Sequence, residues 1–198
     1  MSKHGHGGAR HERFDPARAA MLDDPERLEA LPPQTLFSLL DAPAGARVVD
    51  FGAGTGTYAI ELARQRSDLD VVALDAEPRM LDLLRAKPAA AALANLRPVS
   101  SEALPSLRGT AERVLAINVL HELDDDAMRD LVGLLKAGGK ALFADWRGDI
   151  DRPTGPPRDK VYTPAEARER LARFSLEIEA ETLLVYHYAI VASLKSAA

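Results

Sequence analysis

The segment that most constrains the fold runs from Arg47 to Arg64 and reads R-V-V-D-F-G-A-G-T-G-T-Y-A-I-E-L-A-R. Its β-branched start predicts a short strand that ends in an acid, Asp50. Three glycines follow at alternate positions, and a helical pattern of apolar residues comes after them. A strand, a glycine-rich turn and a helix in this order predict the first unit of a Rossmann-like fold, where a nucleotide-bearing cofactor can lie against bare backbone.

The spacing of the glycines separates two kinds of cofactor turn. A dinucleotide fingerprint has its third glycine three residues after the second, and that position here is Thr57. The observed pattern is Gly-x-Gly-x-Gly, at Gly52, Gly54 and Gly56, with Asp50 just before it. It resembles motif I of the class I S-adenosylmethionine (SAM) dependent methyltransferases.

Length and composition bound the class of protein. A chain of 198 residues fits one domain with a well-buried core. The formal charge of −5 gives no general attraction to nucleic acid, and the absence of Cys excludes disulfides, thiolate metal sites and a Cys nucleophile. No segment has the length of a transmembrane helix, and the start does not read as a signal peptide. We therefore expect a cytoplasmic monomer or homodimer without nucleic-acid or membrane partners.

The N-terminal region divides into a tail and a helical part. Residues 1–13 are rich in His and Gly and are expected to be disordered, with too little fixed geometry for a metal site. Residues 14–198 are expected to form a single domain. Capping signals at Asp15, Asp24 and Pro32, each followed by Pro, predict three short helices before the first strand. This 14–45 segment can pack on the sheet edge, or it can cover the cofactor as a lid that brings Phe14 and Met21 to the substrate.

The rest of the chain alternates strands and helices. Further strands are expected to end at Asp75 and to span residues 96–100, 113–119 and 140–146, with helices between them, including one from about 125 to 136. Two more strands, 176–182 and 186–194, follow without an intervening helix. The alternation predicts an α/β fold with a doubly wound, Rossmann-like parallel sheet. The resemblance to class I methyltransferases adds that the seven-stranded sheet has its last strand inserted antiparallel.

The resemblance covers about residues 14–194 and rests on four ordered motifs: V-V-D-F-G-A-G-T-G, V-A-L-D-A, N-V-L-H-E-L and L-L-K-A-G-G-K-A-L-F-A-D-W. Within the superfamily the chain looks most like small methyltransferases of the ubiquinone/menaquinone biosynthesis and arsenite methyltransferase groups. Arsenite methylation is disfavoured because that chemistry uses Cys thiolates. The implied cofactor is SAM, with S-adenosylhomocysteine as its product.

The resemblance and the chemistry of SAM together assign a cofactor site. Asp50 can accept hydrogen bonds from the cofactor ammonium, and Asp75 can accept from the ribose hydroxyls, or else it caps the helix at Pro78. Adenine is expected beside Ser101 or Glu102. The full predicted set is Asp50, Phe51, Gly52, Ala53, Gly54, Gly56, Tyr58, Asp75, Ala76, Met80, Ser101, Glu102, Asn118, Val119 and Leu120.

Candidate catalytic groups follow the fourth and fifth strands. His121 is either a general base near neutral pH or hydrogen-bonds locally to orient its own loop. Glu122 and Asp145 are further catalytic candidates, and Glu122 can instead pair with a positive group or cap the helix that follows. Trp146 can stack on an acceptor or anchor the loop after it, and Tyr162 borders the same loop. In the last strand Tyr186 and Tyr188 alternate with His187, so we expect only one of these sets to face inward.

The sequence thus predicts a SAM-dependent methyltransferase that transfers a methyl group to a small molecule by in-line displacement. Two alternatives stay open. One is an NAD(P)-dependent Rossmann oxidoreductase, and the other is a SAM-binding protein without catalytic activity.

Overall fold

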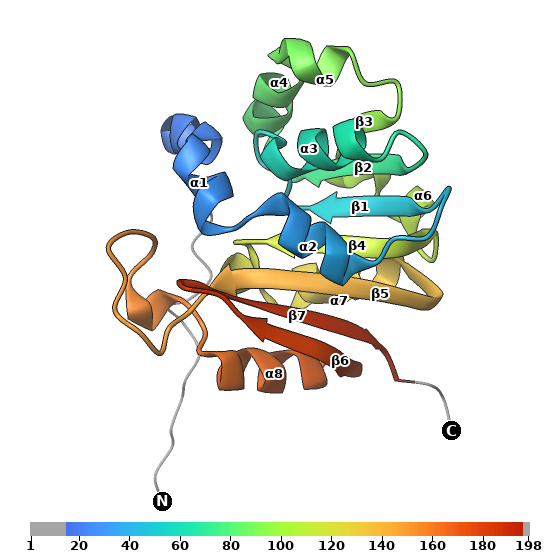
Figure 1. Cartoon of the computed structure of the whole chain (residues 1–198). Helices are drawn as coiled ribbons and strands as arrows, with labels where there is room; N and C mark the ends of the chain where they lie inside the picture. The colour runs from blue at the N-terminus through green and yellow to red at the C-terminus, as the bar shows by residue number, and fades with distance from the viewer. Residues whose placement is uncertain (1–14, 196–198) are drawn as a thin grey trace, which may run out of the picture.

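The computed structural model describes residues 15–195, and within them one sheet has the strand order β3-β2-β1-β4-β5-β7-β6 (Figure 1). The pairs among the first five strands are parallel, whereas β7 runs antiparallel to both β5 and β6. The predicted Rossmann-like α/β sheet with an inserted antiparallel strand is therefore confirmed. The strands are β1 (Arg47–Phe51), β2 (Asp70–Asp75), β3 (Leu96–Ser100), β4 (Ala111–Ile117), β5 (Leu135–Trp146), β6 (Leu176–Leu183) and β7 (His187–Leu194).

Helices cover both faces of the sheet, because consecutive strand residues point to opposite sides and both sides are apolar. Val48 belongs to a core cluster with α2 and α3, and Val49 belongs to a second cluster with α7 and α8. Figure 1 shows α2 in front of the sheet and α7 behind it. The helices after the first strand are α3 (Thr57–Gln65), α4 (Pro78–Ala86), α5 (Pro88–Ala91), α6 (Leu104–Leu107), α7 (Asp125–Leu134) and α8 (Pro164–Ala172), with short 3-10 turns η2 (Ser101–Ala103), η3 (Leu120–Glu122) and η4 (Arg158–Lys160).

Local capping chemistry explains where several helices start and stop. Thr163 and Glu166 form a capping box at the start of α8. Asp124 accepts from the N–H of Ala127 at the start of α7. We expected α7 to reach about residue 136, but it ends at Leu134 because Leu135 already pairs with Ala111 in the sheet. The pairing and burial of Leu135 in the sheet thus replace the last two residues of the predicted helix.

Three short helices precede β1, as the capping signals predict. They are η1 (Pro16–Asp23), α1 (Pro25–Ala30) and α2 (Pro33–Leu40), and the first is a 3-10 helix. Figure 1 shows α1 and the loop after β5 at the side of the sheet where β1 and β5 end. We predict a tail for residues 1–13 and a substrate contact for Phe14. Both lie outside the described residues.

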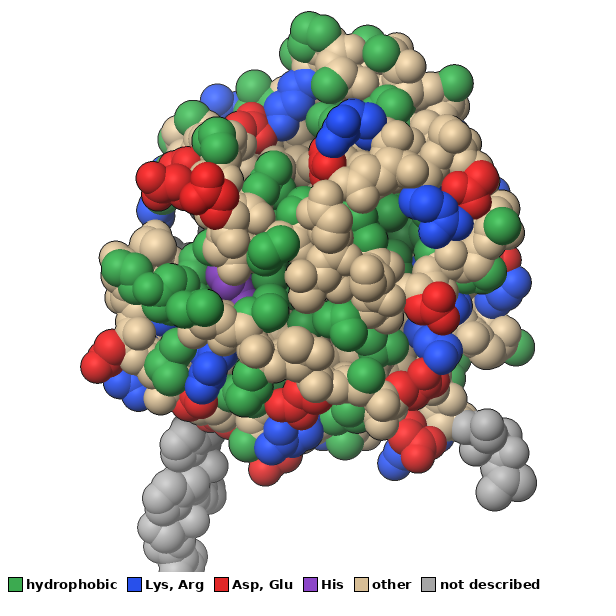
Figure 2. All heavy atoms as spheres, viewed as in Figure 1, with side chains coloured by type: hydrophobic (Ala, Val, Ile, Leu, Met, Phe, Trp, Pro, Cys, Tyr) green, Lys and Arg blue, Asp and Glu red, His purple; other side chains and the backbone are tan. Residues whose placement is uncertain are grey.

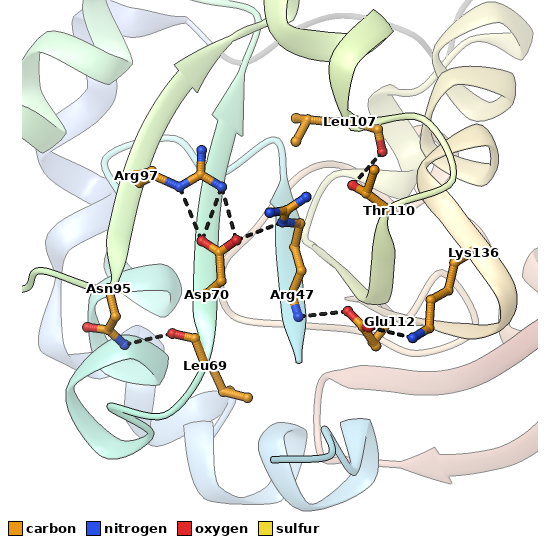
Figure 3. Close-up of polar contacts among 9 residues, drawn as sticks. All are labelled: Arg47, Leu69, Asp70, Asn95, Arg97, Leu107, Thr110, Glu112 and Lys136. Carbon is orange, nitrogen blue, oxygen red and sulfur yellow. Dashed lines mark hydrogen bonds and ion pairs between the residues drawn. The ribbon is translucent and has the colours of Figure 1, made fainter. Parts of the chain in front are cut away.

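The opposite edge of the sheet carries a network of ion pairs (Figure 3). Asp70 at the start of β2 accepts from Arg47 of β1 at 2.7 Å and from Arg97 of β3 at 3.1 Å. Glu112 of β4 accepts from the Arg47 N–H at 2.7 Å and pairs with Lys136. These side chains are partly exposed, so each pair adds at most about 1 kcal/mol. These ion pairs therefore connect the starts of neighbouring strands, and they lie at the opposite end of the strands from the glycine turn.

Candidate functional site

The three glycines of the turn after β1 all adopt the left-handed conformation, with φ values of +74°, +55° and +80° at Gly52, Gly54 and Gly56. A Cβ at Gly52 would lie 2.7 Å from Val119 Cγ2, and one at Gly56 would lie 2.2 Å from Leu84 Cδ1. Glycine is therefore required both by the backbone and by the packing at these two positions. The contact with Val119 also brings the turn after β1 against the segment after β4.

The N–H groups of this turn donate within the protein. Gly52 and Ala53 both donate to the carbonyl of Leu74, at 2.8 and 3.0 Å, and Gly54 donates to Asp75 Oδ2 at 2.7 Å. The end of β2 thus supplies acceptors for these N–H groups, and the turn has no side chains at its three glycines.

Asp50, at the end of β1, is 3% exposed and lies close to the glycine turn. Burial raises its pKa to about 7, and repulsion from Asp75 adds to the rise, while Arg27 and the N–H of Ala59 oppose it. A carboxyl group in this setting gains most from a cationic partner. This fits the predicted role of Asp50 toward an ammonium group.

Asp75 closes the turn from the end of β2. Besides the Gly54 N–H, its carboxylate accepts from the N–H of Glu77 at 2.8 Å. The cap of α4 is Glu77 itself, whose side chain accepts from the N–H of Arg79. Asp75 is therefore not the N-cap of this helix, and the alternative role as a helix cap is wrong.

The segment after β4 contains a strained residue, Asn118, whose φ is +54°. Its N–H donates to the carbonyl of Ala144 at 2.7 Å, but its buried Oδ1 has no hydrogen-bond partner among residues 15–195. A buried acceptor of this kind is unusual and is consistent with a missing donor from a ligand. Leu120, two residues on, is fully buried in the core cluster with α7 and α8.

His121 and Asp145 form a buried pair beside this segment. Nδ1 of His121 lies 2.9 Å from Oδ1 and 3.0 Å from Oδ2 of Asp145, and the His121 N–H also donates to Oδ2 at 3.0 Å. Burial alone lowers the pKa of His121, but attraction and hydrogen bonding from Asp145, with help from Glu122, raise it above its ordinary 6.5. Glu122 Oε1 lies 3.8 Å from Nε2. Since Asp145 accepts at Nδ1, the neutral ring keeps Nε2 as a proton acceptor.

Trp146 anchors the loop that follows β5. Its ring centroid lies 4.0 Å from that of His187, and the guanidinium of Arg152 lies 5.2 Å from it. A Cβ at Gly155 would lie 3.0 Å from the indole. These contacts favour the anchor role for Trp146 over stacking on an acceptor. Figure 2 shows a histidine at the bottom of a hollow on this side of the molecule.

The last strand departs from the expected alternation. His187 is 1% exposed and Tyr188 is 0% exposed, so neighbouring side chains of β7 are both buried and the prediction of one inward set was wrong. Tyr186 is half-buried and precedes the strand. The reason is that β7 packs into a core cluster on each of its two faces. Both ring nitrogens of His187 are buried without a hydrogen-bond partner among residues 15–195, and burial lowers its pKa to about 4.

The remaining predicted residues differ in how far they are buried. Tyr58 is buried and donates to the carbonyl of Leu31 at 3.0 Å, while Tyr162 is buried in the core cluster with α7 and α8. Met21 on η1 is 50% exposed. Buried residues at or after strand ends include Phe51 and Met80, whereas Ala76, Ser101 and Glu102 are exposed.

Two cations were missed by sequence reasoning. Arg27 comes from α1 and Arg152 from the loop after β5, and both have a lowered pKa, chiefly because of burial. Neither residue belongs to a sequence motif. Only its place in a segment expected to lie near the site, the 14–45 segment or the loop after β5, could have identified it. No group of three or more His, Cys, Asp or Glu is arranged to hold a metal ion within residues 15–195. In the same part of the chain no helix is long and apolar enough to cross a membrane.

Comparison with known proteins places the chain in a family. Residues 48–139 match the model of a methyltransferase domain family. An uncharacterized methyltransferase of Mycobacterium tuberculosis strain H37Rv is 34% identical over 147 residues, which cover 67% of this chain and 58% of that relative. The chain thus spans less than two thirds of the length of this curated relative. The release factor glutamine methyltransferase of Escherichia coli is 29% identical over 100 residues, or 50% of this chain and 35% of that protein.

The solved structures agree. A SAM-dependent methyltransferase from Aquifex aeolicus superposes with a TM-score of 0.83 and 25% identity, covering 91% of this chain and 98% of that one. A putative SAM-dependent methyltransferase from Methanococcus maripaludis shares the fold, with a TM-score of 0.67, 19% identity and coverage of 100% and 99%. The chain belongs to the class I SAM-dependent methyltransferases.

Proposed function

We propose that this chain transfers a methyl group from SAM to a small-molecule acceptor by in-line displacement. The observation that carries the proposal is the meeting of three features at one edge of the sheet. The glycine turn follows β1, Asp75 ends β2, and the pair of His121 and Asp145 follows β4 and ends β5. The chain reverses its winding between β1 and β4, and open α/β sheets bind ligands at such a switch point.

The residues at this edge fit the cofactor. The glycine turn brings bare backbone against Val119 after β4, and Asn118 Oδ1 is an acceptor without a partner among residues 15–195. Asp50 would hold the ammonium, Asp75 would accept from the ribose hydroxyls, and Ser101 or Glu102 would meet the adenine. When bound, SAM supplies an electrophilic methyl group that needs alignment and exclusion of water more than acid or base assistance.

His121 provides the means to remove a proton from the acceptor. Asp145 fixes the ring through Nδ1 and leaves Nε2 as the proton acceptor, and Glu122 lies beside it. A raised pKa keeps this histidine a stronger base than a free imidazole and stabilises the imidazolium that forms. We propose His121 as the general base, Asp145 as its positioning partner, and residues 14–45 as a lid over a single domain.

A binding experiment distinguishes this proposal from an oxidoreductase. S-adenosylhomocysteine at a hundredfold its dissociation constant should stabilise the protein by about 2.7 kcal/mol in a thermal-shift assay. NAD and NADP at the same concentrations should leave the melting temperature unchanged. Stabilisation by a nicotinamide nucleotide, with none by SAM or its product, would reject the proposal.

A further inference from the structure

Arg27, on α1, is a cation that lies beside the start of α3. Its Nη1 donates to the carbonyl of Leu22 at 2.6 Å, and its guanidinium lies 5.9 Å from the ring centroid of Tyr58. Within residues 15–195 no carboxylate comes within ion-pair distance of it. A guanidinium carries five N–H donors, so most of its hydrogen-bonding capacity is unused by these contacts.

Arg27 faces a buried carboxyl across a gap. Both groups lie at the start of α3: Arg27 lies over the ring of Tyr58, and Asp50 accepts from the N–H of the next residue, Ala59. Asp50 and Arg27 attract each other but do not form an ion pair. Two opposite charges taken out of water and left apart are costly, and a ligand with a complementary pair of charges would satisfy both.

Contacts with the glycine turn set the position of Arg27. The Leu22 carbonyl that accepts from Arg27 also accepts from Thr57 Oγ1 at 2.9 Å. The next residue, Asp23, accepts from Thr55 Oγ1 at 2.6 Å and from Lys87 Nζ at 2.5 Å. These hydrogen bonds therefore fix the position of Arg27 relative to the glycine turn, which contacts the cofactor in the proposed function.

We infer that Arg27 binds the α-carboxylate of the cofactor while Asp50 binds its α-ammonium, so that the two residues together recognise a zwitterionic amino-acid head. This inference rests on the proposed function. A guanidinium forms charge-assisted hydrogen bonds with a carboxylate and can do so in a bidentate manner. The N-terminal segment would thus select a cofactor that carries the complete amino acid, because Arg27 is half-buried near Asp50 whereas Arg18, the other arginine of residues 15–30, is exposed.

Two ligands that differ only in this head test the inference. S-adenosylhomocysteine carries the amino acid, whereas 5′-methylthioadenosine has the same nucleoside and thioether without the ammonium and carboxylate. Isothermal titration of the full chain with each ligand would be compared for wild type, Arg27→Met and Arg27→Lys. Arg129→Met, which removes an exposed arginine on α7, is the control for loss of one positive charge.

Arg27→Met should weaken S-adenosylhomocysteine binding about 10–100-fold, the loss of hydrogen bonds to a charged group, and change 5′-methylthioadenosine binding less than about twofold. Arg27→Lys should recover part of the affinity, and Arg129→Met should match wild type. Equal loss for both ligands, or no loss for S-adenosylhomocysteine, would overturn the inference and leave the proposed function standing. Wild-type protein that binds neither ligand would overturn both.

Discussion

Nδ1 of His121 lies within 3.0 Å of both carboxylate oxygens of Asp145, which is fully buried at the end of β5. The pair joins the segment after β4 to the end of β5 and places a titratable ring at the edge of the sheet that also carries the glycine turn. The charge state of the His121 ring is therefore controlled by the buried carboxylate of Asp145.

The pH titration of His121 should report this control. In wild type the ring should titrate above 6.5, since Asp145 favours the imidazolium more than burial disfavours it. Asp145→Asn keeps the shape of the side chain but removes its charge, so it should lower the pKa of His121. NMR of the histidine rings measures both values, with His121→Gln used to assign the signal. His187, with a pKa of about 4, is an internal reference that titrates at much lower pH. An unchanged His121 titration in Asp145→Asn would contradict the assignment.

Asp50 should make the protein less stable as pH rises. Its folded pKa of about 7 exceeds the ordinary 3.8, so the folded state holds the proton more tightly than the unfolded state. The contribution of Asp50 to stability is fully present below pH 4 and is lost as pH rises toward 7, by roughly 4 kcal/mol at most. Asp50→Asn does not titrate and should gain stability relative to wild type over this interval, while losing affinity for S-adenosylhomocysteine. Urea unfolding at pH 4 and pH 8 measures the effect, and a difference independent of pH would rule it out.

Removal of the Asp75 carboxylate should affect both binding and stability. Asp75→Ala leaves the N–H groups of Gly54 and Glu77 without their acceptor, which costs about 1–3 kcal/mol of unfolding free energy. Loss of the proposed ribose contact should also abolish measurable binding of S-adenosylhomocysteine. Asp82→Ala, which removes a carboxylate 75% exposed on α4, is the matched control and should change neither property. Wild-type affinity in a folded Asp75→Ala variant would refute the ribose role.

Two glycines with similar backbone geometry should differ in their tolerance of alanine. Gly45 and Gly56 have φ values of +73° and +80°, so both variants pay a similar cost of about 1 kcal/mol for the left-handed conformation. Only at Gly56 does the new Cβ meet Leu84, at 2.2 Å. Gly56→Ala should therefore lose a further 1–3 kcal/mol or so. Chemical denaturation of the two variants measures the difference, and equal losses would show that packing at the turn is loose.

Much of the fold follows from local pattern. Short apolar runs ending in acids identified β1, which ends one residue after Asp50, and β2, which ends at Asp75. Pro after a capping residue identified the first helices. The alternation rule failed at His187 because it assumes one exposed face, whereas β7 packs into a core cluster on each face.

The site was only partly predictable. His121 and Asp145 could be assigned to one edge of the sheet because both follow parallel strands, but their direct pairing depends on side-chain geometry. Arg27 was not predictable because its position depends on hydrogen bonds between residues far apart in the chain, such as that of Thr55 with Asp23. Long side chains on segments outside the sheet are placed by tertiary contacts of this kind.

Methyl transfer itself is the central claim, and methyl-labelled SAM tests it most directly. Wild type and Asp75→Ala would each be incubated with labelled SAM and a small-molecule extract of cells, and the low-mass products separated. We predict that wild type moves label from SAM into at least one product, and that Asp75→Ala moves none. Wild-type protein that binds SAM but transfers no label to any acceptor would contradict the account and indicate a SAM-binding protein without catalytic activity.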